Sequence, residues 1–456
     1  MRRHRKITRA ILAFWTPSSL ARSLLCLFQM KSQWCIIADD FTGAGDSAVQ
    51  FGSAGRPVRL LLSPQVKNID ARRTAALVVD TDTRFLSPNQ AYEKVAKITR
   101  ELHDAGARTF FKKIDSTLRG NPADEIAAVM DAANYRFALV APSAPRNGRT
   151  VVGGHCLVDG RPLMDTGVSR DPFTPVKDSR IASLLERRFP GTVRELGLDL
   201  VRSGKAPLAA KVAEELSKGA RVFVVDAETM EDLNSVASLV SMDGVLFVGS
   251  SGLAEAVASV ESSRRMAMTR IPLGRSLFVI GSITAISSLQ CTRLVGTGKV
   301  VELVVDSGKV LSDPGTELQR LIGLVGGAPK NKALLIRTSG SKDPGSTTLA
   351  DKQSGLEISR FLSTLTLRIV QARRIRFLFA SGGDTAARIA EAMETDSIDF
   401  VAELLPGLPF GSFRSGALGR KLYFVTKSGG FGGPDAMADA LDLVTSRPVP
   451  LKELRA

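Results

Sequence analysis

Charged and hydroxyl side chains gather after three short apolar runs in the first half of the chain. They lie in ADDFTGAGDS (38–47), DTDTR (80–84) and KIDSTLRGN (113–121). The carboxyl ends of parallel strands share one edge of a sheet, and ligands bind at that edge in such folds. The residues that we expect to meet there and bind substrate are Asp39, Asp40, Arg84, Lys113, Asp115, Ser116, Thr117 and Arg119.

These residue types suit a small polyhydroxylated carboxylate. Carboxylates accept hydrogen bonds from hydroxyl groups, and arginine and lysine pair with an anionic group. Asp and Ser directly after a strand also cap the next helix, which explains some members of the set. Three clusters with charges of both signs exceed what capping needs, so we predict a substrate site.

Glycine-rich segments follow the apolar runs of the second half: GS (281–282), SGS (339–341), SGGDT (381–385) and KSGGFGG (427–433). Glycine lets backbone N–H groups approach phosphate oxygens, and a helix N-terminus favours negative charge. There is no GxxxxGK[ST], so these are not a Walker-type P-loop. The predicted nucleotide-binding residues are Ser282, Gly382, Gly383, Asp384, Thr385, Lys427, Gly429 and Gly430.

ADDFTGAGDS allows two other interpretations. Gly43–Ala48 satisfies the letter of the dinucleotide fingerprint, but two aspartates precede it and no acidic residue follows about 20 positions on to hold a ribose. GAGD is also the anion-hole motif of ribokinase-type sugar kinases. In those enzymes the motif comes late in the chain, whereas here it follows the first predicted strand.

Composition narrows the class of protein. A chain of 456 residues with 44% hydrophobic residues suits two or three packed domains. The net charge is +15, but residues 1–29 hold six basic and no acidic residues, which leaves 55 basic against 46 acidic residues in the remainder. Those form no long basic run, and aromatic content is 6%. We therefore expect a small anionic substrate and no nucleic-acid partner.

Residues 1–29 form a basic extension that we expect to be disordered, either a transit peptide or the product of an upstream start codon. Its apolar stretch Ala10–Trp15 is too short to span a membrane. The four cysteines are far apart and make no CxxC pair, and three histidines exclude a multi-histidine metal site. We expect a cytoplasmic enzyme without a membrane partner.

Short β-branched runs alternate with helical patterns along the chain, which predicts parallel sheets with crossover helices. The predicted strands are Trp34–Ala38, Val58–Leu62, Ala75–Asp80, Thr109–Lys113, Phe137–Ala141, Arg221–Asp226, Gly244–Val248, Ser276–Ile280, Val300–Val305, Ala333–Arg337, Arg376–Ala380 and Leu422–Thr426. The fold class expected is α/β with two domains, each a mostly parallel sheet flanked by helices, and an active site in the cleft between them. The predicted boundaries are 30–262, a linker 263–275, and 276–456. Residues 44–54 are expected to form the first helix, and 142–177 a hairpin or lid beside the site.

From Met30 onward the chain resembles the four-carbon acid sugar kinases. IIADDFTGAGDSAVQFGSAG, FKKIDSTLRGN, VGSSGLAEA, VIGSITAISSLQ, SGGDTA, LPGLPFG and VTKSGGFGGPDAM match that family in order and spacing. The resemblance implies an N-terminal acid-sugar domain and a C-terminal ATP domain, with phosphorylation of a terminal hydroxyl on threonate, erythronate or 3-oxo-tetronate. It places substrate against Asp40, Arg84 and 113–117, and ATP against Ser282, 382–385 and Gly430. Gly430 stands where relatives often carry Asn.

For the chemistry we expect Asp40, or else Asp115, to orient or deprotonate the attacking hydroxyl, with Asp39 as the next candidate. ATP would bring Mg²⁺, and no protein metal site can be picked out. Two other classes stay open: a nicotinamide-dependent oxidoreductase of a hydroxy acid, and a non-catalytic sugar-acid sensor. The particular acid sugar and the oligomeric state, a homo-oligomer included, are not determined by the sequence.

Overall fold

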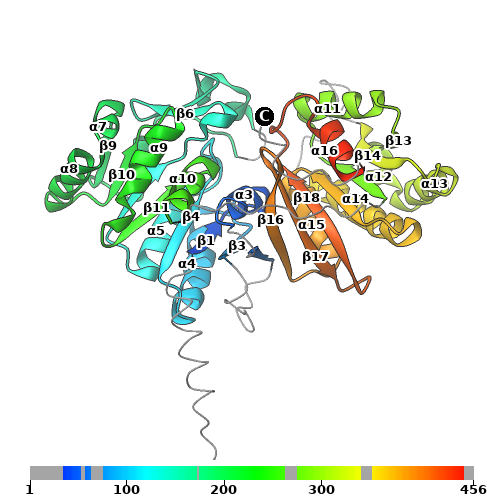
Figure 1. The fold of residues 1–456 in the computed structure, drawn as a ribbon, viewed down its shortest axis with the longest axis horizontal. Helices are drawn as coiled ribbons and strands as arrows, with labels where there is room; N and C mark the ends of the chain where they lie inside the picture. Colours follow the sequence, from blue (N-terminus) through cyan, green and yellow to red (C-terminus); the bar gives the residue numbers. More distant parts are fainter. Residues whose placement is uncertain are drawn as a thin grey trace, which may run out of the picture.

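The computed structural model describes residues 34–52, 57–62, 75–171, 174–261, 275–339 and 352–445. The extension 1–29, nearly all of the predicted linker, and Gly340-Ser341 of the second glycine-rich segment lie outside these ranges. The described residues form two lobes, which we call the N-lobe (34–261) and the C-lobe (275–445). Figure 1 shows them side by side, with helices on both faces of their strands.

The N-lobe strands pair in parallel and are mostly buried, as apolar runs predict. The edge strand Val193–Leu196 is the exception, since Glu195 is exposed. In sheet order they are β2 (Val58–Leu61), β3 (Ala76–Asp80), β1 (Trp34–Ala38), β4 (Thr109–Lys113), β11 (Val245–Gly249), β5 (Phe137–Ala141), β10 (Val222–Val225) and β9 (Val193–Leu196). The helices are α3 (Phe41–Ala48), α4 (Pro88–Asp104), α5 (Pro122–Ala133), α6 (Ile181–Glu186), α7 (Leu198–Arg202), α8 (Lys205–Ser217), α9 (Met230–Ala237) and α10 (Ser251–Glu261).

The C-lobe repeats this arrangement and adds an antiparallel part. Its sheet order is β13 (Val300–Val305), β14 (Ala333–Thr338), β12 (Ser276–Ile280), β15 (Phe377–Ser381), β18 (Arg420–Lys427), β17 (Leu408–Ser415) and β16 (Ser397–Leu405). The helices are α11 (Ala285–Gly296), α12 (Ser307–Ser312), α13 (Pro314–Gly327), α14 (Lys352–Arg373), α15 (Gly383–Ala392) and α16 (Ala436–Thr445).

The two lobes share one sheet of 15 strands. β16 pairs antiparallel with β2, and the pair is reinforced by an ion pair between Arg59 and Asp399 at 2.7 Å. The fold class predicted from the sequence is confirmed, but the sequence did not predict that the two sheets join. β16 and β17 were absent from the predicted strands, because their pairing partners are distant or antiparallel and leave no helix between them.

Helix α3 lies at the junction of the lobes and contacts α15, β17 and β18 as well as its own strands. Its close approach to the C-lobe favours glycine, because a Cβ on Gly45 would lie only 3.1 Å from Thr426 Oγ1. Gly45 of GAGD therefore serves packing between the lobes, whereas a Cβ on Gly43 would meet Asp40 and Lys113 of the N-lobe.

The segment 142–177 forms a small separate sheet, in agreement with the predicted hairpin. Its strands are β6 (Arg149–Val152), β7 (His155–Val158) and β8 (Arg161–Pro162), paired antiparallel. Short 3₁₀ helices flank them at Pro145–Asn147, Leu163–Asp165 and Gly167–Arg170.

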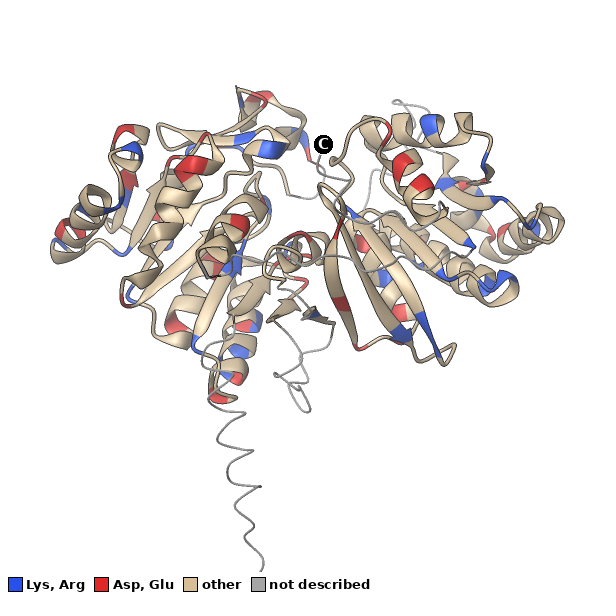
Figure 2. Ribbon diagram, viewed as in Figure 1, with Lys and Arg blue, Asp and Glu red and all other residues tan. Residues whose placement is uncertain are grey.

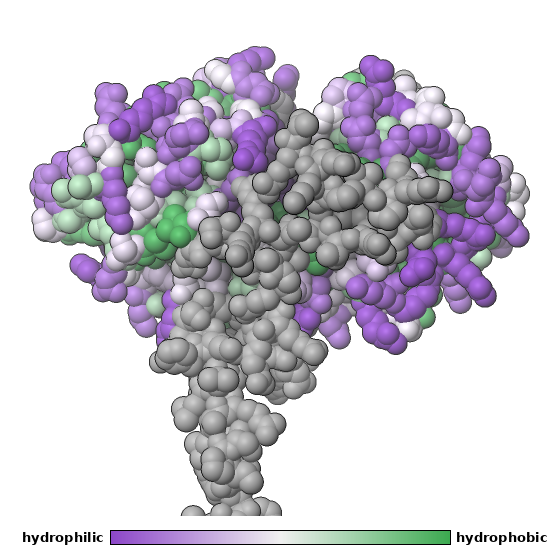
Figure 3. Space-filling model, viewed as in Figure 1, coloured by the Kyte–Doolittle hydropathy of each residue, from purple (hydrophilic) through white to green (hydrophobic). Residues whose placement is uncertain are grey.

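Charges of both signs are interspersed over both lobes (Figure 2). Hydrophilic residues dominate the part of the surface that Figure 3 shows in colour, where the two lobes stand apart at the upper edge. No helix within the described ranges combines the length and apolarity needed to cross a bilayer.

Candidate active site

The first helix begins immediately after the first strand. Asp40 is the N-cap of α3 and accepts a hydrogen bond from Gly43 N at 3.1 Å, so α3 starts at Phe41 and ends at Ala48. The sequence had placed this helix at 44–54. The cap explains the earlier start. The Gly43 N–H has no acceptor within the helix, and the Asp40 side chain supplies one, so the helix can begin directly after Asp40.

Arg84 joins the clusters that follow β1 and β4. Its Nε donates to Asp39 Oδ2 and its Nη2 to Asp40 Oδ1, both at 2.7 Å, and Nη2 lies 3.6 Å from Asp115 Oδ1. Burial alone would raise the pKa of Asp39, but the charges of Arg84, Lys112 and Lys113 outweigh it and hold that pKa below its ordinary value. Nη1 of Arg84 takes part in none of these contacts.

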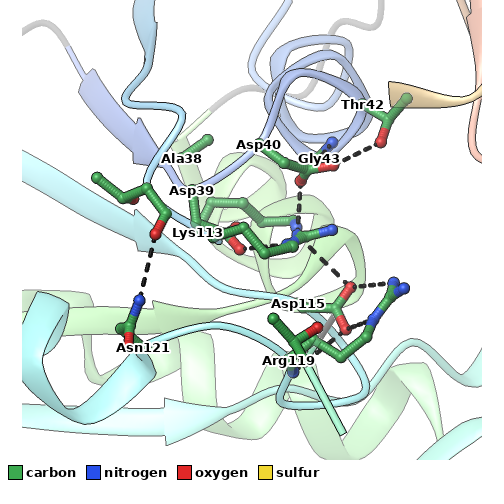
Figure 4. A network of polar contacts seen from close by, with 12 residues as sticks. Ala38, Asp39, Asp40, Thr42, Gly43, Lys113, Asp115, Arg119 and Asn121 are labelled. Atoms are coloured by element: carbon green, nitrogen blue, oxygen red, sulfur yellow. Dashed lines mark hydrogen bonds and ion pairs between the residues drawn. The ribbon is translucent and has the colours of Figure 1, made fainter. Parts of the chain in front are cut away.

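Asp115 is bound from several sides by its own loop. Arg119 donates from Nε and Nη2 at 2.8 and 3.0 Å, and the Thr117 hydroxyl and backbone N–H donate to the same carboxylate. Burial raises the pKa of Asp115, but Arg119 and Arg84 oppose it and bring that pKa well below its ordinary value. Figure 4 shows Asp40, Asp115 and Arg119 in one network at the ends of β1 and β4.

Lys113 lies on the α3 side of β4 and is 4% exposed. A Cβ built on Gly43 would stand 2.6 Å from its Nζ, so the ammonium lies against the first turn of α3. The charge of this lysine therefore acts on Asp39 from the side of the sheet that α3 covers.

The nucleotide-type turn of the C-lobe is built as predicted from glycine. Gly382, the N-cap of α15, has φ of +106°, a conformation that an L-residue adopts only with strain. A side chain on Gly281 would collide with Thr385, which packs the turn after β12 against the turn after β15. Both turns leave backbone N–H groups at a helix N-terminus.

A cavity of about 340 Å³ lies between the lobes and is lined by both sets of strand ends. The predicted residues that line it are Asp40, Arg84, Arg119, Ser282, Gly382, Gly383, Asp384, Thr385 and Gly429. Asp39 and Asp115 do not line the cavity. Asp39 accepts a hydrogen bond from Arg84, and Asp115 accepts one from Arg119. Lys113, Ser116, Thr117, Lys427 and Gly430 are not among the lining residues.

Lys427 binds its own loop. Its side chain is fully buried, and Nζ donates to Ser428 O at 2.8 Å and Gly429 O at 3.1 Å. Burial lowers its pKa to about 8. These bonds hold the glycine loop that the sequence predicts to bind nucleotide.

Several lining residues were not in the predicted site. Thr42 donates to Asp40 Oδ2 at 2.7 Å, and Asp80 and Asp82 add carboxylates after β3. Burial, followed by the charges of Asp40 and Asp82, raises the pKa of Asp80 to about 8. A strand-end position could have indicated Asp80 and Asp82. An apolar wall from α14, Leu356, Ile358 and Leu362, carried no such signal.

The cavity therefore joins a wall of charged side chains from the N-lobe to a glycine-rich wall from the C-lobe. Residues 34–257 match the sugar-binding N-terminal domain family, and residues 277–437 match the nucleotide-binding C-terminal domain family. The D-threonate kinase of Salmonella typhimurium is 32% identical over 89% of this chain and 97% of that protein. The chain belongs to the four-carbon acid sugar kinase family.

Other relatives match over a similar share of the chain. The D-erythronate kinase of Heliobacterium modesticaldum is 28% identical over 90% of this chain and 97% of its own length. The 3-oxo-tetronate kinase of Cupriavidus necator is 28% identical over 89% of this chain and 95% of its own length. Among solved structures, a Salmonella typhimurium protein superposes with a TM-score of 0.77 and a Haemophilus influenzae protein with 0.68. Both are 22% identical, cover 90% of this chain and 98% and 100% of their own, and support the fold.

Proposed function

We propose that this chain is an ATP-dependent kinase that phosphorylates the terminal C4 hydroxyl of threonate, erythronate or 3-oxo-tetronate. One observation carries the proposal: a Cβ on Gly383 would lie 3.4 Å from both Asp40 Oδ2 and Thr42 Oγ1. The acceptor side and the phosphate-type turn therefore touch within one cavity. Phosphoryl transfer needs its two substrates in line and in contact, which this arrangement supplies.

The acid-sugar end is assigned to the N-lobe wall. Arg84 is fixed by Asp39 and Asp40 yet keeps Nη1 for a substrate carboxylate, and Arg119 lines the same wall. The fixed guanidinium loses little freedom on binding, so the contact favours one orientation of the acid. Asp40 then accepts the proton of the attacking hydroxyl or orients it, since it is the carboxylate adjacent to the C-lobe turn.

The nucleotide end is assigned to the C-lobe wall. Backbone N–H groups of 383–385 and of the turn at Ser282 would receive the phosphates, while the Gly382 N–H donates to Lys427 O at 3.0 Å and shapes the turn. The apolar wall of α14 and Ile283 suits the base. By the same proposal the sugar-binding unit is 30–262 and the ATP-binding unit 276–456.

The residues present fit the Mg²⁺ that ATP carries. Asp82 and Asp384 line the cavity from opposite lobes and offer carboxylate oxygens, the donors this ion prefers. Within the described ranges no set of three or more His, Cys, Asp or Glu side chains is arranged to hold a metal. That suits an ion held chiefly by nucleotide phosphates with one or two protein carboxylates. The ion would neutralise phosphate charge.

The test is ADP release with a panel of D- and L-threonate, D- and L-erythronate and their 3-oxo forms, with phosphorus NMR of the product. Release stimulated by one tetronate, with phosphate on C4, is expected. Absorbance change at the nicotinamide band without ADP release would instead indicate an oxidoreductase. Binding of a tetronate without any turnover would indicate a sensor.

A further inference from the structure

Two neighbouring lysines of β4 point to opposite faces of the sheet. Lys113 faces α3, and Lys112 faces the core between the sheet and α5, where Phe110 and Ile114 of the same parity are buried. The Lys112 side chain has no exposed surface. A buried ammonium in an apolar core costs several kcal/mol unless it is fully paired.

Lys112 is fully paired. Its Nζ lies 2.7 Å from Glu125 Oε2 of α5, in a pair whose side chains are 0% and 1% exposed. It also donates to Lys113 O at 2.7 Å and to Ile37 O at 3.2 Å. Two hydrogen bonds to carbonyls and one ion pair, whose carboxylate oxygens make no hydrogen bond, therefore surround the ammonium group.

The two carbonyls belong to the strand ends that carry the site. Ile37 O lies two residues before Asp39, and Lys113 O two residues before Asp115. One ammonium group thus ties the end of β1 to the end of β4, which are adjacent parallel strands. Its charge, after that of Arg84, helps to hold the pKa of the buried Asp39 carboxyl below its ordinary value.

We propose that Lys112 is a positioning residue for the acid end of the substrate. It keeps the ends of β1 and β4 in register and the Asp39 carboxylate charged, so that Asp39 fixes Arg84 at the cavity wall. Lys112 touches neither the cavity nor the reacting atoms. The inference rests on the proposed function, since its readout is affinity for an acid sugar.

The test replaces the ion pair by two apolar side chains, Lys112→Met with Glu125→Met. Such a replacement leaves no unpaired buried charge and is often neutral for stability. We expect the thermal midpoint to stay at or above that of the wild type. KM for the acid sugar should rise roughly tenfold, while KM for ATP and kcat stay within about twofold. If this variant does not fold, Lys112→Gln with Glu125→Gln also leaves no buried charge and keeps an amide donor for the carbonyls. Only the charge is then lost, so KM for the acid sugar should rise by less than about tenfold, with KM for ATP and kcat unchanged.

The coupling to Asp39 is tested in a double-mutant cycle. If Lys112 acts through Asp39, Asp39→Asn should also raise the acid-sugar KM, and the combined variant should show less than the product of the two effects. Arg194→Met removes an ion pair at the far edge of the sheet, with Glu215 at 3.1 Å, and serves as the control with unchanged KM values.

An acid-sugar KM unchanged in the folded variant, or effects that multiply fully, would overturn the inference and leave the kinase function intact. No turnover of any tetronate by the wild-type protein would instead remove the proposed function, and this inference with it.

Discussion

Asp40 of the N-lobe lies directly against Gly383 of the C-lobe. The carboxylate that caps α3 thereby meets the first residue of α15, and a Cβ on Gly383 would be 3.4 Å from Asp40 Oδ2. The contact brings together residues that are more than 340 positions apart in the sequence. It places a general-base candidate at the N-terminus of the helix that would receive the nucleotide phosphates.

Gly383→Val should lower kcat by one or two orders of magnitude and raise KM for ATP. Branched methyl groups would push Asp40 and Thr42 out of line at the point where the two walls meet, and misplacement of about 1 Å can cost about a hundredfold. Steady-state kinetics with both substrates would measure this. Gly323→Val in α13, where a Cβ would meet nothing within 4 Å, is the matched control.

Asp40→Asn should lower kcat by about 10² to 10⁴, the usual contribution of a general base. Asparagine still caps a helix, so α3 and the nucleotide affinity should be retained. The measurements are kcat and ADP binding by calorimetry. Turnover like that of the wild type would exclude Asp40 as the base.

Lys427→Met should raise KM for ATP about three- to tenfold and leave KM for the acid sugar unchanged. The variant removes the donor that holds Ser428 O and Gly429 O, although Thr284 and Ser287 still donate to Gly429 O at 2.7 and 2.9 Å. Lys421→Met, an exposed position on the same strand, is the control. If Lys427 contacted the transferred phosphate itself, kcat would fall much further than KM rises.

Asp46 should make the protein less stable as the pH rises. Its Oδ1 is buried without a hydrogen-bond partner, and burial raises its pKa from 3.8 to about 8. The folded protein therefore keeps a proton that the unfolded chain releases near pH 4, so the free energy of unfolding falls between about pH 4 and pH 8.

Asp46→Asn should flatten that dependence, with a larger gain relative to the wild type at pH 8 than at pH 5. Urea unfolding at the two pH values measures it. Some slope should remain, because burial also raises the pKa of Asp80 to about 8. Equal slopes for wild type and variant would show that Asp46 is ionised in the folded protein.

The regular α/β part of the fold was predictable because its signal is local. Trp34–Ala38, Thr109–Lys113, Phe137–Ala141, Ser276–Ile280 and Val300–Val305 have the predicted bounds. All five pair in parallel, and Trp34–Ala38, Phe137–Ala141 and Ser276–Ile280 are fully buried apolar runs with helices between them. β16 and β17 were missed, since β16 mixes half-buried and buried residues and pairs with a strand more than 330 residues away.

The sequence predicted which residue types form the candidate site, but it predicted less well which contacts each side chain makes. Strand-end position indicated Asp40, Arg84 and the SGGDT turn, all of which line the cavity. It could not separate Lys112 from Lys113, whose side chains leave the strand on opposite faces, nor show that Lys427 folds back on its own loop.

The sequence by itself determined the fold class, the family and the two kinds of chemistry, because strand periodicity, glycine turns and motif order are written along the chain. Only the tertiary structure decided which charges meet. The pairing of β2 with β16 and the packing of α3 on both lobes bring Asp40 to Gly383, and burial then sets which carboxylates stay charged. The distances between side chains and the loss of water around them exist only in the folded state, so they could not be read from the order of residues.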